Sequence, residues 1–162
     1  MTAIHPKLAA GEDRLSWTPL LELAAQEVFA LMLGGNLAPA PDPFPENELD
    51  VAAIVGLAGQ ISGAIALRCT PQSATRMAAK MLGAVSGEAG PEVSDAVGEI
   101  CNMIAGNFKN KIPGMGDGCV LSVPIVITGT DYSLHSLACS ARIEIYLLFE
   151  KLPLIVSITV HS

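Results

Sequence analysis

Two β-rich runs joined by a very short connection narrow the folds that this chain can adopt. Residues 50–57 and residues 60–67 are rich in Val, Ile, Leu and Ala, and only Ala58 and Gly59 separate them. A connection of two residues that includes glycine is typical of a β-hairpin, whose strands are antiparallel neighbours. The sequence therefore predicts an antiparallel sheet that contains this hairpin.

Three helices are predicted from the residues that begin and end them. Each predicted start has a proline at the first helical position, where the missing backbone N–H is not needed. Gly34 and Gly83 follow the ends of the first two helices, as C-terminal stops do. The predicted helices span residues 19–33, 71–82 and 91–112.

The order of the predicted elements indicates an α+β fold. Three further strands are expected at about residues 119–128, 134–149 and 153–160. A helix, a hairpin, two helices and then an antiparallel meander favour an antiparallel sheet of about five or six strands packed against three helices. The 162 residues fit a single domain spanning residues 1–162. Residues 1–14 are expected to be a loose lead-in or an edge strand.

Charge and hydropathy exclude several classes of partner. The net charge is −7 and only nine Lys and Arg residues are present, so the chain lacks the basic patch that nucleic-acid binding needs. The apolar runs are too short, or too interrupted by polar residues, for a bilayer span, which takes about 20 apolar residues. No basic and then apolar export signal opens the sequence. We therefore expect a cytoplasmic protein without a membrane segment.

Motifs for a metal or a catalytic triad are weak. The four cysteines are widely spaced, without a C-x-x-C pair or histidines at ligand spacing, so we expect reduced thiols and no metal site. Asp131, Ser133 and His135 are predicted to share one turn, whereas a Ser-His-Asp relay needs groups that converge from separate elements. Turn polarity explains these three residues better than catalysis does.

The predicted third helix has an apolar face and a polar face. At about 100° per residue, five apolar side chains fall on one side and are expected to face the sheet. They are Val93, Val97, Ile100, Ile104 and Phe108. The residues that group on the opposite side are Asp95, Glu99, Asn102, Gly106 and Lys109. Glu99 and Asn102 are three apart, roughly 5–6 Å at Cβ, so a carboxylate and a carboxamide are predicted to project together into solvent. Many surface helices carry such residues without a function.

A longer pattern around this pair is more specific. The stretch Asp95-Ala-Val-Gly-Glu-Ile-Cys-Asn-Met-Ile-Ala-Gly-Asn-Phe-Lys109 resembles the Glu-x-x-Asn signature of the CheC/CheX/FliY family of chemotaxis phosphatases. Residues 50–57 with 63–67 look like that family's first strand pair, and residues 121–129 look like a later strand. The resemblance covers about residues 17 to 160 and is closest to the CheX branch. It implies a CheC/CheX-like fold.

The resemblance implies a hydrolase that removes the aspartyl phosphate from a CheY-type response regulator, in chemotaxis or related two-component signalling. Such a receiver supplies its own Mg²⁺, so no cofactor of this chain's own is expected. A carboxamide can accept and donate hydrogen bonds with one water, which suits Asn102 for orienting the attacking water. Glu99 is expected to pair with the receiver's active-site lysine. The candidate receiver contacts are Asp95, Gly98, Gly106 and Lys109.

Two alternatives stay open at this point. The same fold resembles the middle domain of the flagellar switch protein FliM, so a non-enzymatic receiver-binding or flagellar-switch-type docking module is the rival of the phosphatase. The presence of both Glu99 and Asn102 favours the enzyme. Asn107 and Lys109 match the family pattern, but they could equally support the end of the third helix.

A homodimer is also predicted. The CheX branch forms homodimers, and the apolar runs 143–148 and 152–160 carry little charge to protect a sheet edge from pairing with another chain. Symmetric pairing of two copies is the commonest closed arrangement. We expect the copies to join along sheet edges, with the two faces that carry Glu99 and Asn102 directed away from the joint.

Overall fold

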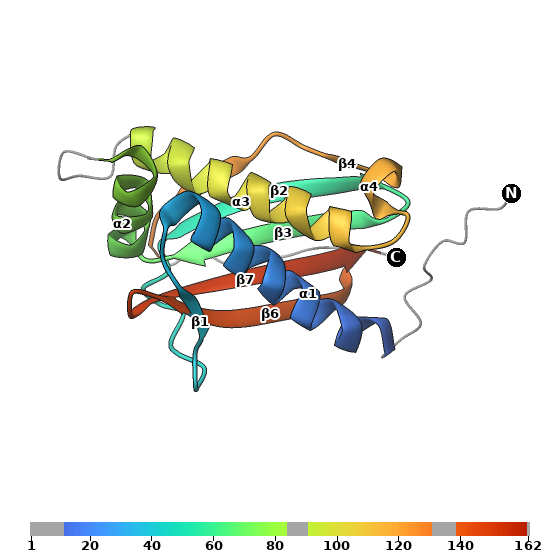
Figure 1. Ribbon diagram of the computed structural model, residues 1–162, viewed down its shortest axis with the longest axis horizontal. Helices are drawn as coiled ribbons and strands as arrows, with labels where there is room; N and C mark the ends of the chain where they lie inside the picture. Colours follow the sequence, from blue (N-terminus) through green and yellow to red (C-terminus); the bar gives the residue numbers. More distant parts are fainter. Residues whose placement is uncertain (1–11, 84–90, 131–138, 162) are drawn as a thin grey trace, which may run out of the picture.

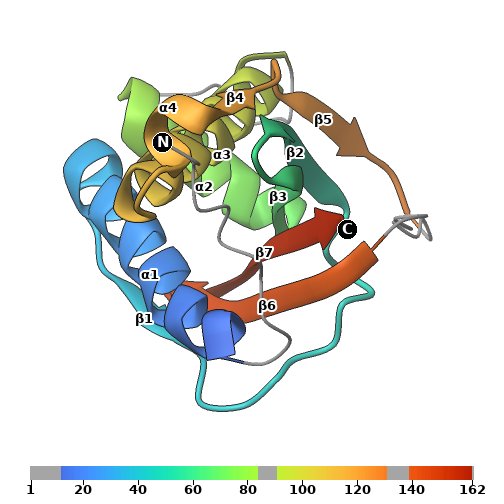
Figure 2. The same ribbon diagram turned by 90° about the vertical axis from the view of Figure 1, so that its right-hand side faces the viewer.

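The helices lie on one face of a single antiparallel sheet (Figure 1 and Figure 2). The computed structural model describes residues 12–83, 91–130 and 139–161. Its helical elements are α1 (Glu12–Val28), the π-helical segment η1 (Phe29–Leu33), α2 (Pro71–Leu82), α3 (Pro91–Lys111) and α4 (Met115–Gly118). Its strands are β1 (Leu37–Pro39), β2 (Val51–Gly59), β3 (Ser62–Cys69), β4 (Cys119–Leu121), β5 (Ile125–Thr128), β6 (Cys139–Phe149) and β7 (Leu152–His161).

The sheet confirms the predicted α+β class and differs from the prediction in strand order. The order is β1-β6-β7-β3-β2-β4, β5 also pairs with β2, and every pair is antiparallel. Seven strands are present among the described residues, and the fourth helix is a single turn. β4 and β5 pair with β2, on the other side of the sheet from β6, so the last strands do not form the predicted meander. β7 lies between β6 and β3. The apolar run 152–160 is therefore inside the sheet and not at an edge.

The predicted hairpin is present, but its turn lies two residues later than predicted. β2 and β3 pair in register along the hairpin, and the chain reverses at Gln60 and Ile61. Gly59 still belongs to β2, where it pairs with Cys119 of β4. A Cβ atom at Gly59 would lie 2.2 Å from the carbonyl oxygen of Gly118. The glycine is needed for two reasons: the chain that leads into β4 comes this close, and the backbone of Gly59 has a φ of 134°, which residues with a side chain rarely adopt.

α1 begins earlier than predicted. It is helical from Glu12, and Pro19, which was expected as its first residue, lies inside it. Trp17 explains the longer helix. Its indole is buried and meets the Phe108 ring of α3 edge-on, with the ring centroids 5.5 Å apart. This contact between two helices far apart in the sequence outweighs the local preference for a helix start at the proline.

The first helical region can be compared with the predictions at its start and at its end. Residues 12–14 belong to α1, so the prediction of a loose lead-in or edge strand is wrong for them. Residues 1–11 lie outside the described residues. At the other end Gly34 has a left-handed φ of 64° after η1, which confirms the predicted glycine stop.

α3 packs its apolar face toward the sheet, as predicted. All five residues of the predicted apolar stripe are buried. The helix contacts both α1 and α2, and it lies against β2 and β3. Full burial of each large apolar side chain contributes about 1.5–3 kcal/mol, so the stripe fixes the rotation of the helix about its axis. That rotation turns Asp95 and Glu99 away from the sheet.

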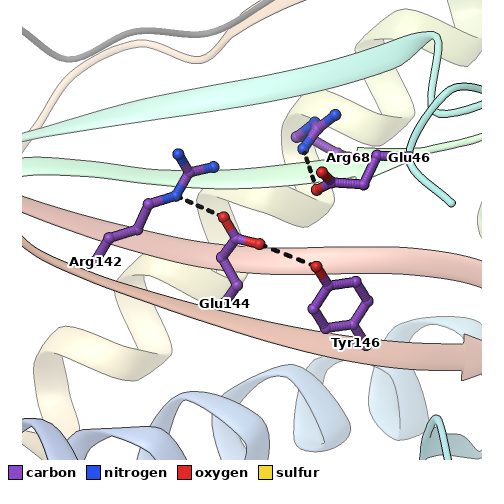
Figure 3. A network of polar contacts seen from close by, with 5 residues as sticks. All are labelled: Glu46, Arg68, Arg142, Glu144 and Tyr146. Atoms are coloured by element: carbon purple, nitrogen blue, oxygen red, sulfur yellow. Dashed lines mark hydrogen bonds and ion pairs between the residues drawn. The ribbon is translucent and has the colours of Figure 1, made fainter. Parts of the chain in front are cut away.

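Residues 40–50 cross the other face of the sheet. Figure 3 shows a polar network on this face, made of Glu46, Arg68, Arg142, Glu144 and Tyr146. Glu46 forms an ion pair with Arg68 of β3 at 2.9 Å. Phe44 packs edge-on against Tyr146 of β6, with ring centroids 5.1 Å apart. This face is therefore partly covered by the chain itself, and the candidate site lies on the helical side.

Candidate functional site

Glu99 and Asn102 stand on the outer surface of α3. Glu99 is exposed and Asn102 is partly exposed, whereas Ile100 and Cys101 between them are buried. Asp95, one turn earlier on the same side, is also exposed. We call Asp95, Glu99 and Asn102 the polar ridge. No residue in the described ranges forms a hydrogen bond or ion pair with a side chain of the ridge. The ridge thus presents two carboxylates and one carboxamide to solvent.

Cys101 lies within the ridge sequence but cannot act as its nucleophile. Its thiol is buried, with Sγ 3.5 Å from the carbonyl oxygen of Ala53 and 3.7 Å from that of Ile65. Burial raises the pKa of the Cys101 thiol to about 12. A thiol in this state is protonated at neutral pH and closed to solvent, so it is a core residue. It is free, as are Cys69 and Cys119, in keeping with the expected reduced thiols.

Two surface depressions flank the polar ridge. One of about 600 Å³ lies toward α2 and is lined in part by Met81 and Leu82. The other, of about 420 Å³, lies toward the β4–β5 segment and is lined in part by Val123. Asp95 and Glu99 line both depressions, so the carboxylates stand on the wall between them. The Glu99 carboxylate can therefore be reached from either depression.

The two glycines predicted as receiver contacts have different surroundings. Gly98 is buried, and a Cβ atom there would lie 3.2 Å from Cγ2 of Val126 and 3.5 Å from Cβ of Pro124. Because Gly98 has no side chain, β5 and the preceding Pro124 can pack closely against α3 at this position. Gly106 is partly exposed, and a Cβ atom there would meet only Leu121, at 3.9 Å. Of these two glycines, Gly106 is the one with open space next to its Cα atom.

Lys109 and Asn107 attach the end of α3 to the rest of the fold. The Lys109 ammonium donates hydrogen bonds to the carbonyl oxygens of Gly116 at 3.0 Å and Cys119 at 2.8 Å. The Asn107 amide donates to the Ala24 carbonyl and to the Glu27 carboxylate of α1, both at 3.2 Å. These contacts favour the supporting role that the sequence left open for both residues.

Glu27 of α1 contacts a second residue of α3 besides Asn107. Lys111 forms an ion pair with the Glu27 carboxylate at 2.7 Å. The hydrogen bond from Lys111, and after it that from Asn107, lowers the pKa of the Glu27 carboxyl below its usual range. The carboxylate therefore stays ionised at neutral pH and joins α1 to the C-terminal end of α3.

Replacing Lys109 by methionine is expected to lower the free energy of unfolding by about 2 kcal/mol, because two charge-assisted hydrogen bonds to carbonyl oxygens are lost. Urea unfolding followed by circular dichroism measures this loss. Lys80→Met is the matched control, since Lys80 pairs with Glu150 at the surface and such pairs contribute about 0–1 kcal/mol. Equal stability of the Lys109 variant and the wild type would contradict the supporting role.

Two kinds of site do not occur in the described part of the chain. No three His, Cys, Asp or Glu side chains there are grouped so that they could hold a metal ion. None of the helices there combines the length and the apolar character that crossing a membrane takes. Asp131, Ser133 and His135 lie outside the described residues.

Sequence reasoning missed the residues that form the walls of the two depressions. Val123 and Pro124 fall within a single predicted strand, residues 119–128, which the structure divides into β4 and β5. Pro124 was the available signal, because proline cannot donate to a strand ladder and is found at edges and bulges. Met81 and Leu82 carry no comparable signal, since an apolar residue near the end of a helix is predicted to be buried in the core.

Solved structures of similar fold support the family prediction. A CheX structure from Desulfovibrio desulfuricans has a TM-score of 0.76 and 26% identity, and the match covers 90% of this chain and 99% of that one. The CheX–CheY–BeF3–Mg²⁺ complex from Borrelia burgdorferi gives a TM-score of 0.74 at 20% identity, covering 90% of this chain and 98% of that one. These matches establish a CheX-like fold.

The sequence comparisons reach the same family. The sequence model described as "Chemotaxis phosphatase CheX" matches residues 51–148, from β2 through α3 and the polar ridge into β6. The CheY-P phosphatase CheX of Thermotoga maritima is 24% identical over 102 residues. That match covers 62% of this chain and 66% of the relative, slightly less than two thirds of its length. Because the family match spans more than half of the chain and contains the ridge, this protein belongs to the CheX family.

Proposed function

We propose that this protein hydrolyses the aspartyl phosphate of a CheY-type response regulator. The observation that carries the proposal is the placement of Glu99 and Asn102 on the outer face of α3, where no described residue bonds to either side chain. The relative from T. maritima is named a CheY-P phosphatase, and the similar structure from B. burgdorferi is a complex with CheY, BeF3 and Mg²⁺. Both names support a receiver as the partner and substrate.

Asn102 is the residue that we expect to orient the attacking water. Phosphoryl transfer asks mainly for positioning and charge stabilisation, and the receiver brings its own Mg²⁺. What a partner must add is a water held in line with the bond to be broken. The carboxamide of Asn102 has an acceptor oxygen and a donor NH₂. It can therefore accept a hydrogen bond from one water and also donate a hydrogen bond to it. Asn102 is partly exposed, so water can reach its amide.

Glu99 is the residue that we expect to align the receiver. The leaving group is a carboxylate of low basicity, so no general acid is needed at this position. Glu99 and Asp95 place two carboxylates one turn apart on α3. A pair of this kind attracts a cationic surface and fixes its orientation, and the receiver's active-site lysine supplies the matching charge.

One experiment separates this proposal from its non-enzymatic rival. The protein is mixed with an aspartyl-phosphorylated CheY-type receiver, and the loss of label is followed against the receiver alone. Faster loss with catalytic amounts of the protein supports the phosphatase. Binding of the receiver without faster loss contradicts it and supports a docking module of the same fold. A receiver of two-component signalling works in the cytoplasm, so the proposal places this protein there as well.

We also propose a homodimer, joined at the β6 edge of the sheet. β1 pairs only with the last three residues of β6, so within the described residues 141–145 face no strand on their outer side. At the opposite edge, β5 lies against α3 beside the polar ridge, and a joint there would bury one of the two depressions. Pairing at β6 leaves both ridges open. Sedimentation at micromolar concentration should give twice the chain mass, and a single species near 16.8 kDa would contradict the dimer.

A further inference from the structure

The edge strand beside α3 contains one extra residue. β4 and β5 both pair with β2, and the register pairs on either side of the gap are Leu57↔Leu121 and Ile54↔Ile125. Between these pairs β2 has two residues and the edge strand has three. Ser122 closes the gap: its N–H donates to the Gly56 carbonyl at 2.9 Å, and its hydroxyl accepts from the Gly56 N–H at 2.7 Å. Residues 122–124 therefore form a β-bulge, a feature that often re-aims side chains next to active sites.

The bulge turns Val123 outward at the wall of the smaller depression. Pro124 and Val126 pack toward the Gly98 position of α3, which holds the edge strand against the helix. Val123, between Ser122 and Pro124, is 82% exposed. It lines the same depression as Asp95 and Glu99. An apolar side chain and two carboxylates thus border one groove from two different elements.

This edge is unusually apolar for a free surface. Of seven exposed large apolar side chains in the described part of the chain, three lie here: Val120 at 69%, Val123 at 82% and Ile125 at 62%. Val123 is the one of these three that also lines the groove beside the ridge. An exposed apolar side chain next to a polar site, as Val123 is, commonly marks a protein interface.

Two observations favour a receiver over a second copy of this chain on this edge. A bulge with a proline interrupts the row of backbone donors that strand pairing needs, so the edge is a poor template for another strand. The groove is also acidic on its helix side, because Asp95 and Glu99 line it and no Lys or Arg of the described residues does. It fits a partner that presents a cationic centre with apolar side chains around it.

We propose that Val123 is a docking contact for the receiver, placed by the bulge so that it binds an apolar side chain of the receiver while Glu99 meets the receiver's cationic centre. The inference rests on the proposed function and adds to it a second contact point on a different element. Val123 acts through affinity for the receiver, whereas Asn102 acts on the hydrolytic step.

The test compares two exposed valines of the same edge. Val123→Asp should raise both the dissociation constant for a CheY-type receiver loaded with beryllium fluoride and Mg²⁺ and the KM for the phosphorylated receiver, each by about tenfold or more, with a much smaller change in kcat. Val123→Ala should lose affinity in the same direction but less, and Val123→Leu should retain it. Val120→Asp, the matched control outside the groove, should change neither constant by more than about twofold. Unfolding midpoints are recorded for all variants.

Each other result has a defined meaning. If Val123→Asp binds and hydrolyses like the wild type, the docking contact is wrong while the phosphatase stands. If the wild type binds the loaded receiver but does not speed dephosphorylation, the phosphatase fails, and the affinity of the variants still decides the contact. If both aspartate variants shift the sedimentation mass and leave receiver affinity unchanged, this edge joins two copies of the chain and the proposal is overturned. Failure of the wild type to bind any CheY-type receiver overturns both.

Discussion

With Asn102 replaced by alanine, the aspartyl phosphate of the receiver is expected to be lost about 10²–10³-fold more slowly than with the wild-type protein. The reason is that the attacking water loses the one side chain that we propose to hold it in line. Alanine favours a helix, and the Asn102 side chain bonds to no described residue, so the fold should be unchanged. The measurement is single-turnover loss of label at saturating concentrations of the protein.

Asn110→Ala is the matched control for this variant. Asn110 is an exposed asparagine of the same helix that lies outside the polar ridge. Its replacement should leave the rate within about twofold of wild type, well short of the loss expected for a preorganised polar contact. The Asn102 variant should also bind a receiver loaded with beryllium fluoride and Mg²⁺ nearly as tightly as the wild type. A hydrolysis rate within about threefold of wild type would remove Asn102 from the mechanism.

Glu99→Gln is expected to weaken receiver binding by about tenfold or more and to slow turnover as well. The change keeps the size and shape of the side chain and removes its charge. Close charge pairs across interfaces contribute about 1.5 kcal/mol or more, which corresponds to at least tenfold in affinity. Titration calorimetry at low ionic strength measures the effect.

Salt dependence tests the charge argument directly. If the proposed pair stays partly solvated, the difference between wild type and Glu99→Gln should shrink as ionic strength rises toward 1 M, where the Debye length is about 3 Å. Glu48→Gln is the control, because it removes the same charge from an exposed position on the segment that crosses the other face of the sheet. Equal affinities of wild type and Glu99→Gln at low salt would contradict the docking role of Glu99.

The parts of the fold that local signals encode were predicted, and the parts that depend on distant contacts were not. α2 and α3 begin and end close to the predicted positions, because prolines and glycines act within a few residues of themselves. The start of α1 was missed because it depends on Trp17 meeting Phe108 of another helix. The pairing of β7 with β3 joins strands far apart in the sequence, and no local pattern specifies such a partner.

The candidate site divides in the same way. The 3.6-residue period places the apolar stripe inward and Glu99 outward, so the polar ridge could be predicted from one helix. The groove beside it could not, because Val123 and Gly98 come from different elements and meet only in the folded chain. The catalytic and docking roles of Glu99 and Asn102 stay predictions, since they concern a partner that must bring the phosphate.

α3 is held to the edge of the sheet at two places, one within the polar ridge and one near the C-terminal end of the helix. Gly98 allows Val126 to pack closely against the helix, and Lys109 bonds the carbonyl oxygens of Gly116 and Cys119. A backbone that is already ordered loses little conformational entropy when a partner binds. Such a rigid template does not reshape itself for different forms of a receiver. Under the proposed function, the choice between phosphorylated and unphosphorylated receivers therefore lies in the receiver, whose conformational equilibrium decides how often a shape that fits the template is present.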